Sequence, residues 1–280
     1  MVGITAEHGL NYRKLALEAR GKLPPFSPIL NRLMASLASE DVQVSELADW
    51  IEKDTVLAGH VLRLVNSVVF SLRGMVSSVR HAIAIMGLIK LRNLVLGLSV
   101  SRMWQNLKTP LGWSMRRFNL HATASSVLAD LLAQHLPCDF GEGAFTAGLL
   151  HDIGELLIAI GVPQQYLEIR RLQQDGFGGQ LDFEQFVLGA THADLSGDTL
   201  RAWNLPAPIH EAAAAHHTVE APGAGQWPAP LAWIVRLADE LVDMEEEPAL
   251  EHLRASGVGE RAERIYTTFQ AEFSVLRDCF

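Results

Sequence analysis

The sequence has few of the residues that would place it in a specialised class of protein. Of its 280 residues only two are cysteine, Cys138 and Cys279, so neither a disulfide framework nor a thiolate zinc site is expected. Lysine and arginine number 23 against 32 acidic residues, which gives a net charge of −9. An acidic chain has no overall electrostatic attraction to nucleic acid or to an anionic membrane, so we expect neither as a partner.

Long apolar runs and a signal peptide are also missing. The longest apolar stretches, 94–100 and 156–162, are well short of the ~20 residues that a membrane helix needs. Residues 1–23 carry scattered charges where a signal peptide would have its apolar stretch. These absences predict a cytoplasmic protein.

Strand patterns are scarce as well, because there is little sustained alternation of apolar and polar residues. Apolar residues recur instead at gaps of three and four, the spacing of an amphipathic helix. Hydrophobic residues make up 49% of the chain, which is enough for a globular core. The sequence therefore predicts an all-α protein.

Proline and glycine divide the chain into a polar leader, 1–22, and two helical halves, 23–112 and 113–280. We expect a helical bundle in the N-terminal half, packed on the second half. The second half is predicted to contain single helices over 118–136, 141–160, 166–174, 182–203, 208–217, 231–244 and 260–278. Trp227, in the proline- and glycine-rich loop 219–230, is the best candidate for an exposed interface anchor.

Polar residues within the apolar helices of the second half are the strongest functional signal. Burying an imidazole or a carboxylate without a partner costs several kcal/mol, and mutual pairing or a divalent metal would offset that cost. Imidazole nitrogen and carboxylate oxygen are common ligands of iron, manganese and zinc. The alternative is structural: satisfied core histidines and helix-capping aspartates. The candidates are His121, His151, Asp152, His192, His216, His217 and Asp239.

The order His, then His-Asp, then Asp resembles the HD superfamily of metal-dependent phosphohydrolases. The matching residues are His121, His151, Asp152 and Asp239. The resemblance implies that these four surround one metal, and that His192, His216 and His217 match the extra histidines of two-metal branches. On a continuous helix, His151 and Asp152 would lie about 100° apart and could both flank one point.

Further motifs, in the same order along the chain, resemble the HDOD family, the HD-related output domain of bacterial signalling proteins. They span about residues 22–245: Leu23-Pro24, 62–67 (LRLVNS), 82–87 (AIAIMG), 91–94 (LRNL), 147–154 (AGLLHDIG), 189–194 (GATHAD), 203–206 (WNLP) and the His216-His217 pair. The resemblance implies an N-terminal helical bundle, a degenerate HD-like half and a role in signal transduction.

The chain departs from the active cyclic-di-GMP phosphodiesterase branch at three places. Thr218 follows the paired histidines, where that branch has glycine-tyrosine-proline. Glu155 replaces a lysine, and its negative charge would repel a phosphate. Arg117 lies one turn before His121, where a two-metal site would have a carboxylate.

Three functions remain open. The leading prediction is a regulatory output module that contacts other signalling proteins. The alternative is a metal-dependent phosphohydrolase of a nucleotide or phosphoester, in which His192, His216 or His217 holds a second metal or acts as general acid. The third is a sensor of a nucleotide second messenger, which would use Arg117, Arg236 and the histidines.

Overall fold

The computed structural model describes residues 6–35, 37, 44–66, 75–176, 178–223 and 226–277, with side chains from residue 11 onwards. Two residues used above, Ser67 and Cys279, lie outside these ranges. Throughout the described part the chain is helical and contains no strand, only an isolated bridge between Cys138 and Ala229. The all-α prediction is confirmed.

Polar side chains cap several helices of the N-terminal half. Asp54 accepts a hydrogen bond from the Leu57 amide at 2.9 Å and begins α4, and Ser78 begins α5 in the same way. Gly87, at φ 87°, turns the chain between α5 and α6. The helices are α2 (Pro28–Ala35), α3 (Val44–Glu52), α4 (Thr55–Val65), α5 (Val79–Met86) and α6 (Leu88–Trp104).

Asn66 gives one of the sequence motifs a structural role. Its amide nitrogen donates to the carbonyls of Leu62 and Val76, both at 2.8 Å, and its oxygen accepts from the Val76 amide at 2.7 Å. One side chain therefore ties the end of α4 to the segment that leads into α5.

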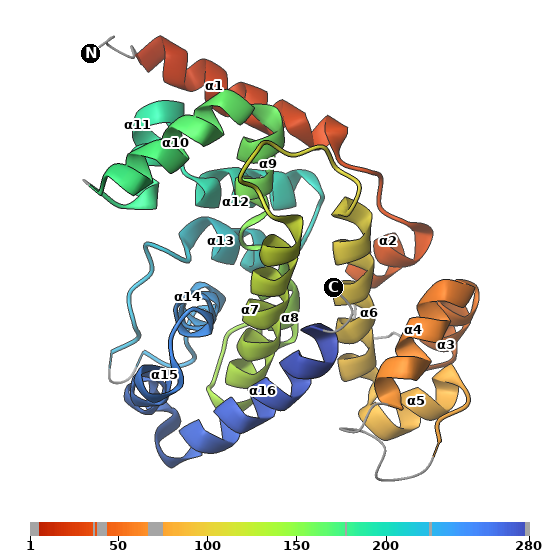
Figure 1. Cartoon of the computed structure of the whole chain (residues 1–280). Coiled ribbons are helices and arrows are strands. Elements are labelled where there is room, and N and C mark those ends of the chain that lie inside the picture. Colours follow the sequence, from red (N-terminus) through yellow and green to blue (C-terminus); the bar gives the residue numbers. More distant parts are fainter. Residues whose placement is uncertain are drawn as a thin grey trace.

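The second half is built around α7, which contacts α6, α8, α14 and α16 (Figure 1). Gly148 on α8 packs against the backbone of Ser125 and Ser126 on α7, and this close approach brings α8 onto the central helix. One apolar core runs through both halves. The helices are α7 (Met115–His135), α8 (Ala144–Leu150), α9 (Ile153–Gly161), α10 (Pro163–Asp175), α11 (Gln180–Leu188), α12 (His192–Ala202), α13 (Ala207–Ala215), α14 (Leu231–Val242), α15 (Glu246–Leu253) and α16 (Ala262–Arg277).

Two predicted single helices are wrong, because each is interrupted. The helix expected over 141–160 breaks at 151–152, between α8 and α9. The helix expected over 182–203 ends at Gly189, which adopts the left-handed conformation (φ 70°). A capping box of Thr191 and Asp194 then starts α12. The sequence interpretation also missed α15.

Helix α1 (Ala6–Glu18) falls within the predicted leader and packs on the second half of the chain, against α9, α11 and α12. Arg13 forms an ion pair with Asp198 at 2.9 Å, and Lys22 donates to the carbonyl of Ile160 at 2.9 Å. Figure 1 shows α1 lying across one end of the second half.

Trp227 is less exposed than the sequence predicted. Trp227 is half-buried and packs edge-to-face on Trp233 with 5.9 Å between ring centroids, so the prediction that it is exposed is wrong.

The helical stretch Gly141–Gly161 and the bent pair Val79–Met86 with Leu88–Trp104 are apolar and long enough to cross a membrane. In the first of these, 94% of the apolar window is buried inside the protein, as in a core helix.

Candidate metal centre

The structure brings all seven candidate residues together, in two groups that share Asp152. Ligand atoms of His121, His151, Asp152 and Asp239 lie within 4.8 Å of one another, and so do those of Asp152, His192, His216 and His217. His121 is on α7 and Asp239 on α14, whereas the other five lie where helices begin or end. Five of the seven side chains therefore come together because the ends of their helices meet at one place.

On one side, the carboxylate oxygens of Asp152 and Asp239 face the Nε2 atoms of two histidines. Asp152 Oδ2 lies 3.1 Å from His151 Nε2 and 3.5 Å from His121 Nε2. Asp239 Oδ1 lies 3.0 Å from His121 Nε2 and 3.4 Å from His151 Nε2. Two imidazoles and two carboxylates thus surround a single point.

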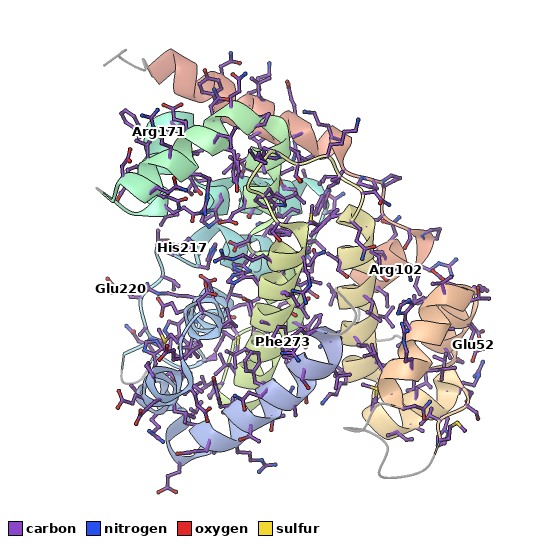
Figure 2. The ribbon with its side chains drawn as sticks, in the orientation of Figure 1. Glu52, Arg102, Arg171, His217, Glu220 and Phe273 are labelled. Atoms are coloured by element: carbon purple, nitrogen blue, oxygen red, sulfur yellow. The ribbon has the colours of Figure 1, made fainter. Side chains whose placement is uncertain are left out.

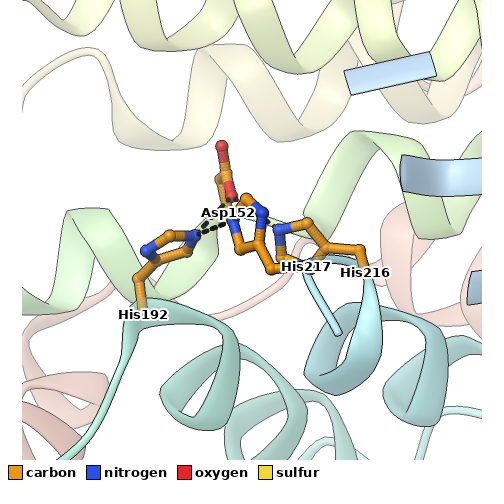
Figure 3. Close-up of side chains that lie close together, drawn as sticks. All are labelled: Asp152, His192, His216 and His217. Atoms are coloured by element: carbon orange, nitrogen blue, oxygen red, sulfur yellow. Dashed lines mark hydrogen bonds and ion pairs between the residues drawn. The ribbon is translucent and has the colours of Figure 1, made fainter. Parts of the chain in front are cut away.

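On the other side, the second oxygen of Asp152 faces a different pair of imidazoles. Oδ1 lies 3.4 Å from His192 Nε2 and 3.6 Å from His216 Nε2, and Figure 3 shows these rings approaching Asp152 from α12 and from the end of α13. His217 Nε2 completes this side, 2.9 Å from His192 Nε2. Asp152 is the one residue common to both groups.

Backbone and carboxylate acceptors fix the orientation of three of the rings. His151 Nδ1 bonds to the carbonyl of Gly148, and His216 Nδ1 bonds to that of Ala213, both at 2.8 Å. His192 Nδ1 lies 2.8 Å from a carboxylate oxygen of Glu184. With the proton on Nδ1 in each neutral ring, the Nε2 lone pair points toward Asp152, as metal ligation requires.

Glu184 is a functional residue that the sequence interpretation missed. It is buried, and besides the ring of His192 it accepts the backbone N–H of the same residue at 2.7 Å. Gln180 donates to it at 2.9 Å. The only sequence signal was an acidic residue within the helix expected over 182–203, eight positions before His192.

Gly154 allows α9 to approach the start of α12. Its amide donates to Ser196 Oγ at 2.9 Å. A Cβ at this position would overlap the carbonyl oxygen of His192 and lie 2.8 Å from its carbonyl carbon. Glycine is therefore needed for His192 to reach Asp152.

The carboxylates and imidazoles perturb one another strongly. Burial alone would lower the pKa of the buried histidines, but Asp152 and Asp239 outweigh it and raise the pKa of His121 to about 11 and of His151 to about 10. For His192, Glu184 and Asp152 likewise outweigh burial and raise the pKa to about 10. The same imidazoles hold the pKa of both aspartates well below the usual range, although burial opposes this.

His216 and His217 shift in the opposite direction. Burial, reinforced by neighbouring imidazoles, lowers the pKa of His216 and lowers that of His217 to about 3. Both are therefore neutral at pH 7. Burial and then the Asp152 carboxylate raise the pKa of Glu155.

Two buried polar atoms without a hydrogen-bond partner in the described part of the chain show that the residues fit a metal. Asp152 Oδ1 and His216 Nε2 are both buried, and neither has a hydrogen-bond partner among the described residues. Because neutral His216 carries its proton on Nδ1, a lone pair on nitrogen and a carboxylate oxygen face each other 3.6 Å apart. A buried cation between them satisfies both, so the donor set fits a divalent metal.

The cluster forms one wall of a cavity of about 780 Å³. His121, Asp152, His192, His217 and Asp239 line it, together with Glu155. Arg236, named in the sensor hypothesis, does not line this cavity. It bonds to Glu240 Oε1 at 2.8 Å and to the carbonyl of Val219 at 2.7 Å, so it has a structural role.

An all-helical fold with this arrangement of histidines and aspartates defines an HD-type protein with a potential metal site. The HDOD domain matches residues 23–219, and the chain belongs to the HDOD family. Asp239 lies beyond the matched range, yet the structure places it in the cluster.

Solved structures share the fold at low sequence identity. An HDOD domain protein of unknown function from Geobacter sulfurreducens is 20% identical with a TM-score of 0.74, covering 96% of this chain and 98% of that one. A candidate phosphohydrolase from Shewanella amazonensis SB2B is 22% identical with a TM-score of 0.73, covering 94% and 97%. A candidate signal transduction protein from Marinobacter aquaeolei VT8 is 19% identical with a TM-score of 0.70, covering 99% and 67%.

Among curated proteins, an uncharacterized protein of Treponema pallidum (strain Nichols) is 23% identical over 199 residues. The match covers 70% of this chain and 38% of the relative. The chain thus aligns with less than half the length of the curated relative it matches.

Proposed function

We propose that this HDOD protein acts in bacterial signalling as a metal-dependent phosphohydrolase of a phosphoester. The observation that carries the proposal is the position of Asp152, whose two oxygens face two separate sets of imidazoles across a shared centre. The orphaned Oδ1 and the cavity beside the cluster support it. Similarity in fold to a candidate phosphohydrolase agrees with it.

The seven residues would divide between two cations. His121, His151 and Asp239 would hold one, and His192, His216 and His217 the other, with Asp152 between them. Iron, manganese and zinc all suit this donor set. When bound, the cations supply Lewis-acid polarisation of a phosphoryl oxygen and lower the pKa of water.

The chain itself would position the substrate and move a proton. Glu155 lines the same cavity, and burial raises its pKa, which favours the protonated carboxyl that a general acid needs. Gln180 donates a hydrogen bond to this carboxyl at 2.5 Å and holds it in place. Glu155 is therefore the candidate general acid, whereas the lowered pKa of His217 leaves it neutral at pH 7 and unsuited to this role.

Metal content and hydrolysis together test the proposal. Asp152→Asn keeps the shape of the side chain but removes the charge shared by both groups. We expect the wild type, after loading and desalting, to retain iron, manganese or zinc and to hydrolyse p-nitrophenyl phosphate or its bis-ester. Asp152→Asn should lose both properties, measured by mass spectrometry of the metal and by absorbance of the product.

The matched control is Asp49→Asn on α3, an exposed carboxylate that pairs with Arg80. This variant should retain both metal and activity. A wild type that takes up no metal, or that hydrolyses equally well as Asp152→Asn, would refute the proposal.

A regulatory module that acts through protein contact is the second candidate. It is favoured by the absence of a glycine-tyrosine-proline triplet after His217 and by exposed apolar side chains in the N-terminal half. Val56, Met75 and Ile89 are 52%, 84% and 56% exposed. If this function is correct, Asp152→Asn will lose metal and still complement a deletion of the gene in its native host. If Asp152→Asn loses both its metal and the ability to complement the deletion, the result favours the phosphohydrolase.

A further inference from the structure

Three exposed arginines line the cavity beside the carboxylates and imidazoles of the cluster. Arg116 and Arg117 lie in the first turn of α7, Arg170 lies on α10, and all three line the cavity that reaches Asp152 and Asp239. These arginines come from two helices that flank the cavity. The metal cluster does not use them.

Helix stability does not explain this placement. The first turn of α7 contains no acidic residue, and arginine at a helix N-terminus opposes the helix dipole. Within the described residues, the guanidinium groups of Arg116 and Arg117 have no ion-pair partner. Arg170 donates to Gln173 Oε1 at 2.8 Å, a neutral group on its own helix. None of these three arginines therefore forms an ion pair within the described residues, although the carboxyl groups of Asp243 and Glu155 line the same cavity.

Tyr166 links the two sets of arginines. It lies on α10 and lines the cavity, and its ring contacts Trp113 edge-to-face with 5.6 Å between centroids. Burial raises the pKa of its hydroxyl; the charges of Arg170 and Arg117 oppose this rise and that of Glu155 adds to it. Arg117, Arg170 and Tyr166 therefore line one cavity, which is larger than a single phosphate requires.

We propose that Arg117, Arg170 and Tyr166 form an anion subsite that binds a second phosphoryl group, so that the ligand of the cavity is a nucleotide carrying at least two phosphoryl groups. The first phosphoryl group would lie at the metal cluster, and in this respect the inference rests on the proposed function. Guanidinium groups bind phosphate through charge-assisted hydrogen bonds. The aromatic side chains Trp113 and Phe273 line the same cavity and offer surfaces for a base (Figure 2 labels Phe273).

Calorimetric titration tests the subsite. The probes are AMP, ADP and adenosine 3′,5′-bisphosphate at constant ionic strength, titrated into the metal-loaded full chain. We expect ADP, the bisphosphate or both to bind at least about tenfold more tightly than AMP, the ratio expected from one additional charge-assisted hydrogen bond. In the double variant Arg117→Gln, Arg170→Gln this ratio should fall to near one, while metal content stays that of the wild type.

Arg171→Gln is the matched control. Arg171 is the neighbour of Arg170 on α10, is exposed and does not line the cavity, so this variant removes the same charge from the same helix (Figure 2). It should keep the wild-type ratio. Equal affinities for the three nucleotides in the wild type would overturn the inference, and so would a preference that survives in the double variant.

The outcomes separate the subsite from the proposed function. A wild type that prefers ADP over AMP but hydrolyses no phosphoester supports the subsite and contradicts the phosphohydrolase. A wild type that hydrolyses p-nitrophenyl phosphate and shows no preference supports the phosphohydrolase and contradicts the subsite.

Discussion

Replacing Gly154 with alanine would place a methyl group against the backbone of the first residue of α12. The added Cβ would overlap the carbonyl oxygen of His192 and lie 2.8 Å and 3.0 Å from its carbonyl carbon and Cα. Cβ atoms essentially never approach other heavy atoms closer than 3.0 Å, so α9 and α12 must separate. The displaced atoms belong to the backbone and cannot relieve the overlap by rotating a side chain.

The expected cost follows from the kind of overlap. Overpacking of a core typically costs 1–3 kcal/mol, and the rigid backbone contact at Gly154 places this variant near the upper end, at about 3 kcal/mol. For a chain of this size each kcal/mol lowers the melting temperature by roughly 2–4 °C, so a decrease of about 6–12 °C is expected. Because His192 moves with α12, the variant should also retain less metal than the wild type.

Gly59→Ala is the control. Gly59 lies on the exposed side of α4, and a Cβ there would have no neighbour within 4 Å. Removing the conformational freedom of a helical glycine should stabilise the protein by about 0.5–1 kcal/mol. Differential scanning calorimetry and metal analysis measure both variants. If Gly154→Ala melts within about 1 °C of the wild type and retains its metal, the reasoning about the contact between α9 and α12 is wrong.

Three further predictions concern the cluster. Glu184→Ala should weaken metal binding roughly 10–100-fold in competition with a chelator, because Glu184 orients His192, and equal affinity would contradict this role. Metal binding near neutral pH should release protons from the three histidines with raised pKa, detected by calorimetry in buffers of different ionisation enthalpy; zero release would contradict the pKa shifts. In chelator-treated protein these histidines stabilise the fold below their unfolded pKa of 6.5, and this stabilisation is lost as the pH rises through about 10 for His151 and His192 and about 11 for His121. The two aspartates stabilise it above their unfolded pKa of 3.8, so urea denaturation should show greater stability at pH 5.5 than at pH 10, and the reverse order would contradict this assignment.

The sequence was sufficient to predict the fold class and the members of the cluster. The three- and four-residue spacing of apolar side chains reflects burial of one helix face, and that spacing survives in the folded protein. Imidazoles and carboxylates inside apolar helices stand out because burying them without partners is costly. His121 and Asp239 show this directly, since each is a polar residue within a continuous helix that packs on the core.

The sequence was insufficient where function depends on interactions between distant segments. Glu184 gains its role from the ring of His192, which reaches it only after the chain turns at Gly189. Arg170 and Tyr166 line the same cavity as Arg117 because α10 packs beside it, and no local sequence pattern indicates that packing. Arg236 is the opposite case. Its charge suggested that it binds a nucleotide, but its guanidinium group already pairs with Glu240 one turn away.

The continuous helix predicted through His151 and Asp152 would not have produced the bridging geometry. Adjacent residues on a helix diverge by about 100°, which would direct the two side chains along different faces. The break between α8 and α9 instead lets His151 Nε2 approach Asp152 Oδ2 to 3.1 Å while Oδ1 remains turned toward α12 and α13. The shared aspartate therefore depends on the interruption of the helix, and Gly154, two residues later, lets the following helix start against His192. His-Asp-x-Gly is thus informative as a unit: the first two residues belong to the cluster, and the glycine provides the space in which His192 reaches them.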